Sequence, residues 1–259
     1  MDLVDLPHSD HGPRGATAVI LLHGFPLDHR MWRAQKEALE HAGWRVIVPD
    51  LRGFGKAPPG RGAPGMKEYA GDVLRLADRA GLSRFVLVGF SMGGYVALEV
   101  ARQAPDRLQG LALVDSRAEP DSDEARAGRV KTADAVRAQG AQVVADAMVP
   151  KMLTAGAPER LHAEVRDMML AQPIEGIVAA LHAMGARPDP RSGLPQLRVP
   201  TLLVVGEHDP ITPPEASKAM AAAIPGARLQ VIPGAAHLSP VEQPEAVNAA
   251  LLAWLHELR

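Results

Sequence analysis

The sequence contains no cysteine among its 259 residues. This absence excludes disulfide bonds, thiolate nucleophiles and zinc–thiolate or iron–sulfur sites together. It also agrees with a cytoplasmic protein, because disulfides are rare in that compartment, and we expect this chain to be cytoplasmic.

Long apolar runs and an excess of one charge sign are absent as well. No apolar run, Ala18–Leu22 included, approaches the roughly 20 residues that span a bilayer. The segment from Met1 to Gly15 lacks the basic and then apolar layout of a signal peptide. The formal net charge of -2 gives no positive field for a phosphate backbone or an anionic membrane. We therefore expect neither nucleic acid nor a membrane as a partner.

The chain alternates short runs rich in leucine and β-branched residues with longer amphipathic stretches rich in alanine. This alternation is typical of βα units around a buried parallel sheet and predicts an α/β fold with a doubly wound, mostly parallel sheet. The predicted strands are Thr17–Leu22, Arg45–Val48, Phe85–Val88, Gly110–Val114, Thr201–Val205 and Arg228–Ile232. The predicted helices around them are Met31–Ala42, Lys67–Ala80, Met92–Gln103, Pro214–Ile224 and Pro244–Leu258.

The stretch between the fourth and fifth predicted strands has no convincing strand and is predicted to contain several helices. We interpret residues 117–191 as an inserted helical cap, with residues 1–116 and 192–259 forming the core. Flexible thioether side chains in the cap could line an apolar substrate pocket, or they could join the cap helices as core residues. Arginines at 117, 126 and 129 alternate with acids, which predicts a solvated helix face. The candidate pocket residues are Met148, Met152, Met168 and Met169.

A candidate nucleophile follows the third predicted strand. Gly89, Ser91 and Gly93 form a G-x-S-x-G motif between that strand and a helix beginning near Met92. In such a turn, glycines are needed because side chains would clash, and the strained backbone pushes the serine hydroxyl outward. The helix N-terminus offers free N–H groups to a developing oxyanion. The context therefore favours a catalytic serine over an ordinary glycine-rich turn.

Five segments together resemble the α/β-hydrolase family, and the resemblance covers almost the whole chain. In that family the amide after the nucleophile and an amide after an early His-Gly pair bind the oxyanion, which implies Met92 and Phe25 here. The family's sheet also begins with extra strands. Few residues precede Thr17, so we expect a trimmed amino-terminal edge with at most one short strand at Asp2–Leu6. The segments are Leu21–Pro26, Pro49–Gly55, Gly89–Gly94, Gly206–Pro210 and Gly234–His237.

A serine nucleophile needs a base within hydrogen-bond reach and a third group that orients the base. His237 is the candidate base, because it follows the last predicted strand at the sheet edge where Ser91 emerges. Asp209 follows the preceding strand and completes the order serine, aspartate, histidine. Asp115 and Glu207 remain alternatives for the acid.

Metal and cofactor sites are not indicated by the same segments. Consecutive side chains in Glu207–Asp209 cannot all point at one ion, and there is no H-E-x-x-H pair. The glycine-rich turn lacks the Lys-Ser/Thr of a phosphate loop and the dinucleotide pattern G-x-G-x-x-G. We therefore expect no metal and no cofactor.

The leading hypothesis is a carboxylesterase that acts on small, largely apolar esters through an acyl-enzyme. Enol-lactonases, and arylesterases with perhydrolase activity, resemble the same arrangement, so a lactone substrate also stays open. Dehalogenases and epoxide hydrolases are disfavoured because they need a carboxylate nucleophile and position 91 is serine. The alternative from another class is a hydrolase-fold ligand receptor with little turnover.

Overall fold

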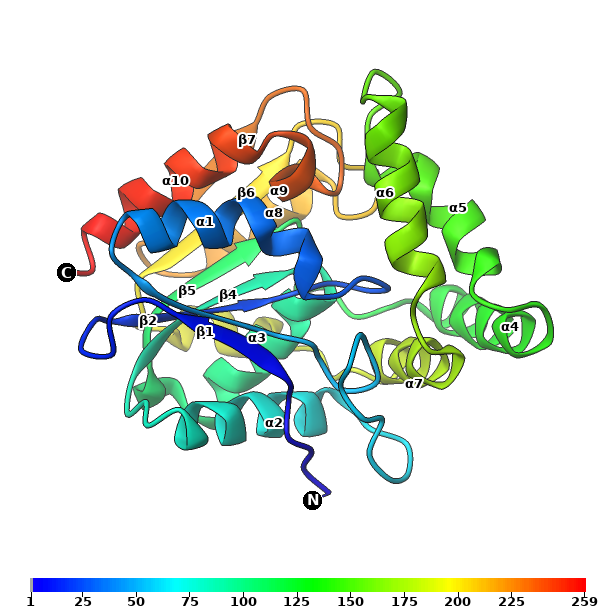
Figure 1. Ribbon diagram of the computed structural model, residues 1–259, viewed down its shortest axis with the longest axis horizontal. Coiled ribbons are helices and arrows are strands. Elements are labelled where there is room, and N and C mark those ends of the chain that lie inside the picture. Colours follow the sequence, from blue (N-terminus) through cyan, green and yellow to red (C-terminus); the bar gives the residue numbers. More distant parts are fainter. Residues whose placement is uncertain (1) are drawn as a thin grey trace.

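A seven-stranded sheet with the order β1-β3-β2-β4-β5-β6-β7 runs through the structure, a computed structural model that describes residues 2–259 (Figure 1). Strand β1 is antiparallel to β3, and the other neighbouring strands are parallel. The carboxyl ends of the parallel strands therefore meet at one edge. The strands are β1 (His8–His11), β2 (Ala18–Leu22), β3 (Arg45–Pro49), β4 (Phe85–Phe90), β5 (Leu108–Val114), β6 (Thr201–Gly206) and β7 (Arg228–Ile232).

Both faces of the sheet are covered by helices. Successive strand residues point to opposite faces, so Ile20 and Leu22 join one buried cluster while Val19 and Leu21 join the other. Helices α2, α3 and α8 supply residues to the first cluster, and α1 and α10 supply the second. The core helices are η1 (His29–Trp32), α1 (Arg33–His41), α2 (Met66–Arg79), α3 (Met92–Gln103), η2 (Pro105–Arg107), η3 (Arg191–Gln196), α8 (Pro214–Ala223), α9 (Ser239–Glu242) and α10 (Pro244–His256).

The predicted α/β fold and its six parallel strands are confirmed, but the short strand proposed at the amino terminus is misplaced. Asp2–Leu6 forms no strand, and the edge strand is β1, four residues from His8 to His11. This segment pairs with Val46–Pro49 of β3. Its polar side chains gave no apolar alternation, so the pairing was not visible in the sequence. Among residues 2–259, no helix has the length and apolar character needed to cross a membrane.

Four α-helices lie between β5 and β6, where the sequence predicted an insert. They gather at one side of the sheet (Figure 1) and contribute to both buried clusters. Residues of α4 and α7 join the cluster with α2 and α3, and residues of α6 join the cluster with α1 and α10. Helix α5 contributes to both clusters, through Val144 to the first and through Ala145 and Met152 to the second. The insert therefore packs against both sides of the core. Its helices are α4 (Asp123–Gln139), α5 (Gln142–Met152), α6 (Glu159–Leu170) and α7 (Ile174–Gly185).

The solvated face predicted for the start of the insert is wrong at Asp121. This side chain is fully buried and pairs with three guanidinium groups, those of Arg117, Arg129 and Arg187. Arg117 precedes α4 and Arg187 follows α7, so one carboxylate joins both connections between the insert and the core. Burial alone would raise the pKa of Asp121, but Arg129 and Arg187 lower it to about 2.

Asp121→Asn should lower the free energy of unfolding by roughly 3–5 kcal/mol, because it leaves the buried Arg187 and two partly buried arginines without their counter-charge. The depressed pKa gives stability that is present above the ordinary carboxyl range and is lost as pH falls from about 4 toward 2. Urea unfolding at pH 7 and at pH 3.5 should therefore show a larger difference between wild type and variant at pH 7.

The matched control is Asp123→Asn, at the exposed first turn of α4. We expect it to cost under about 1 kcal/mol. Equal losses in the two variants would show that the buried ion-pair cluster adds no particular stability.

Candidate active site

Ser91 lies in the tight turn between β4 and α3. Its backbone has φ 50° and ψ -113°, a positive φ that residues other than glycine seldom adopt. A Cβ added to Gly89 would lie 2.3 Å from the Gly93 oxygen, and one added to Gly93 would lie 2.5 Å from the Leu22 oxygen. The strand–turn–helix geometry predicted for this motif is confirmed, and both glycines are required by close backbone approach.

His237 reaches Ser91 from the loop between β7 and α9. Its Nε2 lies 3.0 Å from Ser91 Oγ, the distance of a hydrogen bond. The imidazole is fully buried and packs against the Phe90 ring at 5.1 Å between centroids, whereas Ser91 keeps 8% of its surface exposed. The structure thus brings a candidate base to the hydroxyl of a largely buried serine.

Asp209 holds the other side of the imidazole. His237 Nδ1 lies 2.8 Å from Asp209 Oδ2. The same carboxylate accepts hydrogen bonds from the amides of Ile211 and Thr212 and from Thr212 Oγ1. Burial would raise the pKa of Asp209, but the charge and hydrogen bond of His237 and the bonds from Thr212 hold it below its usual value. Asp209 is therefore a carboxylate that fixes Nδ1–H toward itself and leaves Nε2 to face Ser91.

The sequence reasoning missed Thr212. Its hydroxyl lies 2.5 Å from Asp209 Oδ2 and 3.3 Å from His237 Nδ1. An aspartate followed three residues later by threonine is a spacing at which side chains and backbone amides bond locally. This spacing is the sequence feature from which the contact between Thr212 and Asp209 could have been predicted.

The two alternative acids are engaged elsewhere. Asp115 accepts hydrogen bonds from the Gly206 amide at 2.7 Å and from Ser239 Oγ at 2.5 Å. Burial and the nearby charge of Asp209 raise the pKa of Asp115 well above its usual value. Glu207 is half exposed and accepts from the Gly234 amide. The structure therefore pairs Asp209 with the imidazole.

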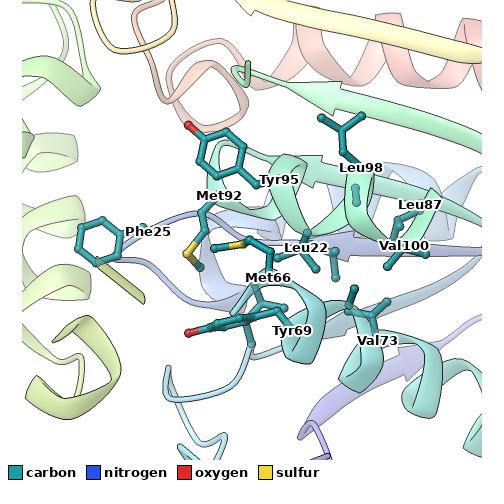
Figure 2. Packing of buried hydrophobic residues seen from close by; sticks show 14 of the residues in the cluster. Leu22, Phe25, Met66, Tyr69, Val73, Leu87, Met92, Tyr95, Leu98 and Val100 are labelled. Atoms are coloured by element: carbon teal, nitrogen blue, oxygen red, sulfur yellow. The ribbon is translucent and has the colours of Figure 1, made fainter. Parts of the chain in front are cut away.

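The loop that carries Phe25 lies directly against Ser91. A Cβ added to Gly24 would lie 3.0 Å from Ser91 Cβ. The side chains of Phe25 and Met92 are buried in the cluster drawn in Figure 2, with Phe25 at one end of it. Within residues 2–259, neither backbone amide donates to a protein acceptor. Both amides are thus held in place with their hydrogens unused.

His23 and Asp50 shape the loops beneath the site. His23 Nε2 accepts a hydrogen bond from the Leu51 amide, and its Nδ1 faces the Gly24 oxygen. Burial lowers the pKa of His23, which keeps the ring neutral in this role. Asp50 accepts hydrogen bonds from the amides of His29 and Lys56. These residues support the neighbouring loops through hydrogen bonds to their backbone amides.

One group of metal-ligand side chains occurs among the described residues. Potential ligand atoms of Asp28, His29 and Asp50 lie within 4.8 Å of one another. Asp28 is already paired with Arg30 and bonded by Gln172, and Asp50 is bonded by His29. A cation would have to displace the Arg30 guanidinium, so the donor set fits a loop network better than a metal centre.

The methionines predicted to line a pocket lie in the insert with different degrees of burial. Met152 and Met169 are fully buried in a core cluster, and Met148 and Met168 are partly buried against it. The full burial of Met152 and Met169 agrees with the alternative that these methionines are core residues that join the insert helices. Two surface cavities, of about 290 Å³ and 990 Å³, lie along α3 and residues 187–200 and are not lined by Ser91 or His237.

Comparison with known proteins identifies the family. A sequence profile described as the alpha/beta hydrolase family matches residues 19–250. The chain belongs to the α/β-hydrolase family. Three features of this α/β hydrolase agree with that membership: the strand order, the tight turn at Ser91 between β4 and α3, and the chain order Ser91, Asp209, His237.

Three relatives illustrate the range around this α/β hydrolase. A thermophilic esterase from Thermogutta terrifontis is 44% identical, with a TM-score of 0.93 and coverage of 98% of this chain and 94% of that one. The enol-lactonase from Burkholderia xenovorans LB400 is 31% identical, with a TM-score of 0.91 and coverage of 98% and 97%. The dihydrolipoyllysine-residue acetyltransferase component of the acetoin cleaving system from Pseudomonas putida is 34% identical over 95% of this chain. The match spans 65% of that protein's length.

Asp209→Asn should lower kcat for a nitrophenyl acetate test substrate by about 10⁴-fold, because the amide would favour the wrong imidazole tautomer. Asp115→Asn should change kcat by less than about tenfold, since Asp115 bonds to Gly206 and Ser239 and not to the imidazole. Steady-state kinetics of the two purified variants distinguish the acids. The reverse ranking would assign the orienting role to Asp115.

Proposed function

We propose that this protein is a serine hydrolase that cleaves carboxylic esters of small, largely apolar substrates through an acyl-enzyme. The observation that carries the proposal is the continuous line of hydrogen bonds from Asp209 through His237 to Ser91. A serine hydroxyl needs such a base to act as a nucleophile at neutral pH. The relation to an esterase at 44% identity supports an ester as the substrate.

In the first half of the reaction Ser91 Oγ attacks the ester carbonyl carbon. His237 Nε2 accepts the hydroxyl proton, and Asp209 stabilises the imidazolium that forms. Collapse of the tetrahedral intermediate breaks the bond to the alcohol oxygen. His237 returns its proton to that oxygen, so the alcohol leaves neutral and the acyl group stays on Ser91.

In the second half water replaces the alcohol. His237 takes a proton from water as it attacks the acyl carbon, and the second tetrahedral intermediate collapses to release the acid. The proton passes back to Ser91 Oγ, and the enzyme returns to its starting state. No metal or cofactor is needed for either half.

The backbone amides of Phe25 and Met92 are the proposed oxyanion donors. Their hydrogens are unused within residues 2–259, and the loop of Phe25 lies beside Ser91. The N-terminus of α3 adds a positive dipole end where charge develops. Preorganised donors of this kind are worth roughly 3–4 kcal/mol each in the transition state.

The insert of residues 117–191 is proposed as a cap over this site, with the Met148, Met152, Met168 and Met169 region as its apolar side. A cyclic ester is the second candidate substrate, favoured by the relation to an enol-lactonase at 31% identity across almost the full chain. The same acyl-enzyme chemistry opens a lactone, and the alcohol stays attached to the acyl group. The lack of cysteine agrees with action in the cytoplasm, and the proposed substrate is a small molecule.

Ser91→Ala should lower turnover of short-chain nitrophenyl esters and lactones by about 10⁶-fold, because the nucleophile is removed. A fluorophosphonate probe should label wild type at Ser91, as read by mass spectrometry, and should leave the variant unlabelled. The relative kcat/KM values over the panel separate ester from lactone preference.

Ser192→Ala, at an exposed position in η3, is the matched control and should behave as wild type. Full turnover by Ser91→Ala would eliminate the mechanism. Stoichiometric labelling of wild type together with negligible turnover on every substrate would instead support a ligand receptor.

A further inference from the structure

Glu242 connects the helical insert to the loop that carries His237. One oxygen of its carboxylate, Oε1, accepts hydrogen bonds from the Thr154 amide at 2.8 Å and from Thr154 Oγ1. The other oxygen, Oε2, accepts from the Ala236 amide at 2.8 Å. A single side chain at the end of α9 therefore joins the segment after α5 to the residue before His237.

A second bond ties the same two segments on the other side of the imidazole. The Leu238 amide donates to the Met152 carbonyl at 2.7 Å. The residues immediately before and after His237 are thus both fixed to the insert, at positions 152 and 154. Because backbone hydrogen bonds at both neighbours fix the peptide planes, they also fix where the His237 side chain starts.

We propose that Glu242 is a positioning residue that sets the placement of His237 relative to Ser91 by holding its loop against the insert. The inference rests on the proposed function. Within residues 2–259 Glu242 has no hydrogen bond to the side chains of Ser91, Asp209 or His237, so it acts through the backbone. The insert then supports the proton relay as well as covering it.

The carboxylate is suited to this role because it accepts at both oxygens. Three donors converge on it, and a glutamine would offer one acceptor oxygen and one NH₂ group. Whichever way the amide is turned, one partner would meet a donor in place of an acceptor. A displacement of about 1 Å between base and nucleophile can cost about 10²-fold in rate.

Glu242→Gln should therefore lower kcat for the preferred ester by about 10- to 100-fold while KM changes by less than about twofold. The matched control is Glu245→Gln, the same change at an exposed position three residues along the chain in α10. It should keep kcat and KM at wild-type values. Titration of Ser91 with a fluorophosphonate normalises both variants to the competent enzyme, so partial unfolding does not imitate the effect.

A spectroscopic measurement separates positioning from a purely structural role. The His237 Nδ1 proton, hydrogen-bonded to Asp209, is expected at low field in the proton NMR spectrum of wild type. Glu242→Gln should shift or broaden this resonance, whereas Glu245→Gln should leave it unchanged. An unchanged resonance together with wild-type kcat in Glu242→Gln would overturn the inference.

Thr154→Val provides the second variant, which is informative even if Glu242→Gln does not fold. It removes one hydroxyl donor and keeps the Thr154 amide bond, so we expect a smaller fall in kcat, of about two- to fivefold, at constant KM. The double variant should lose less than the product of the two single effects, because both act on one link. Wild-type kcat in Thr154→Val, or strictly multiplicative losses, would count against the link.

The activity of Ser91→Ala distinguishes a failure of the positioning role of Glu242 from a failure of the proposed hydrolase function. An inactive Ser91→Ala with wild-type kinetics in Glu242→Gln would overturn only the positioning role. A fully active Ser91→Ala would instead show that the proposed function has failed, whatever Glu242→Gln does.

Discussion

The hydrogen bond between Ser91 Oγ and His237 Nε2 joins residues 146 positions apart, and it exists because parallel strands bring their carboxyl ends to one edge. Ser91 emerges after β4, Asp209 after β6 and His237 after β7. The sheet therefore brings the three residues close together, and the loops orient their side chains toward one another. Because the buried strands are closely packed, their ends have little positional freedom, and the packing of the core therefore fixes where the loops begin.

Much of this arrangement was readable from the sequence because its signals are local. Buried parallel strands appear as continuous apolar runs, and the glycines around Ser91 mark a turn that excludes side chains. Asp209 and His237 lie in the loops that follow β6 and β7, so predicting the strands also predicted the sheet edge at which these two residues meet. The choice of Asp209 over Asp115 stayed open, because it depends on which carboxylate turns toward the imidazole.

The features that escaped prediction depend on partners distant in sequence. Asp121 is surrounded by charged residues, and only the contact with Arg187 across the insert shows that it is buried. Glu242 has the sequence context of a helix end, and its partner Thr154 is 88 residues away. Strand β1 is polar and is recognisable only through its pairing with β3. Pairwise long-range contacts of this kind leave no periodic pattern in one chain.

The division of the insert between the two buried clusters has a consequence for recombining members of this family. Helices α4 and α7 share a cluster with α2 and α3, α6 shares one with α1 and α10, and α5 contributes to both. A graft that exchanges the whole insert must therefore match two hydrophobic surfaces at once. Exchange of the α5–α6 hairpin alone would leave Asp121 and Arg187 intact but would still meet both surfaces, because α5 contributes to both. Such a hairpin must also keep the Met152 carbonyl and Thr154, whose hydrogen bonds hold the loop of His237.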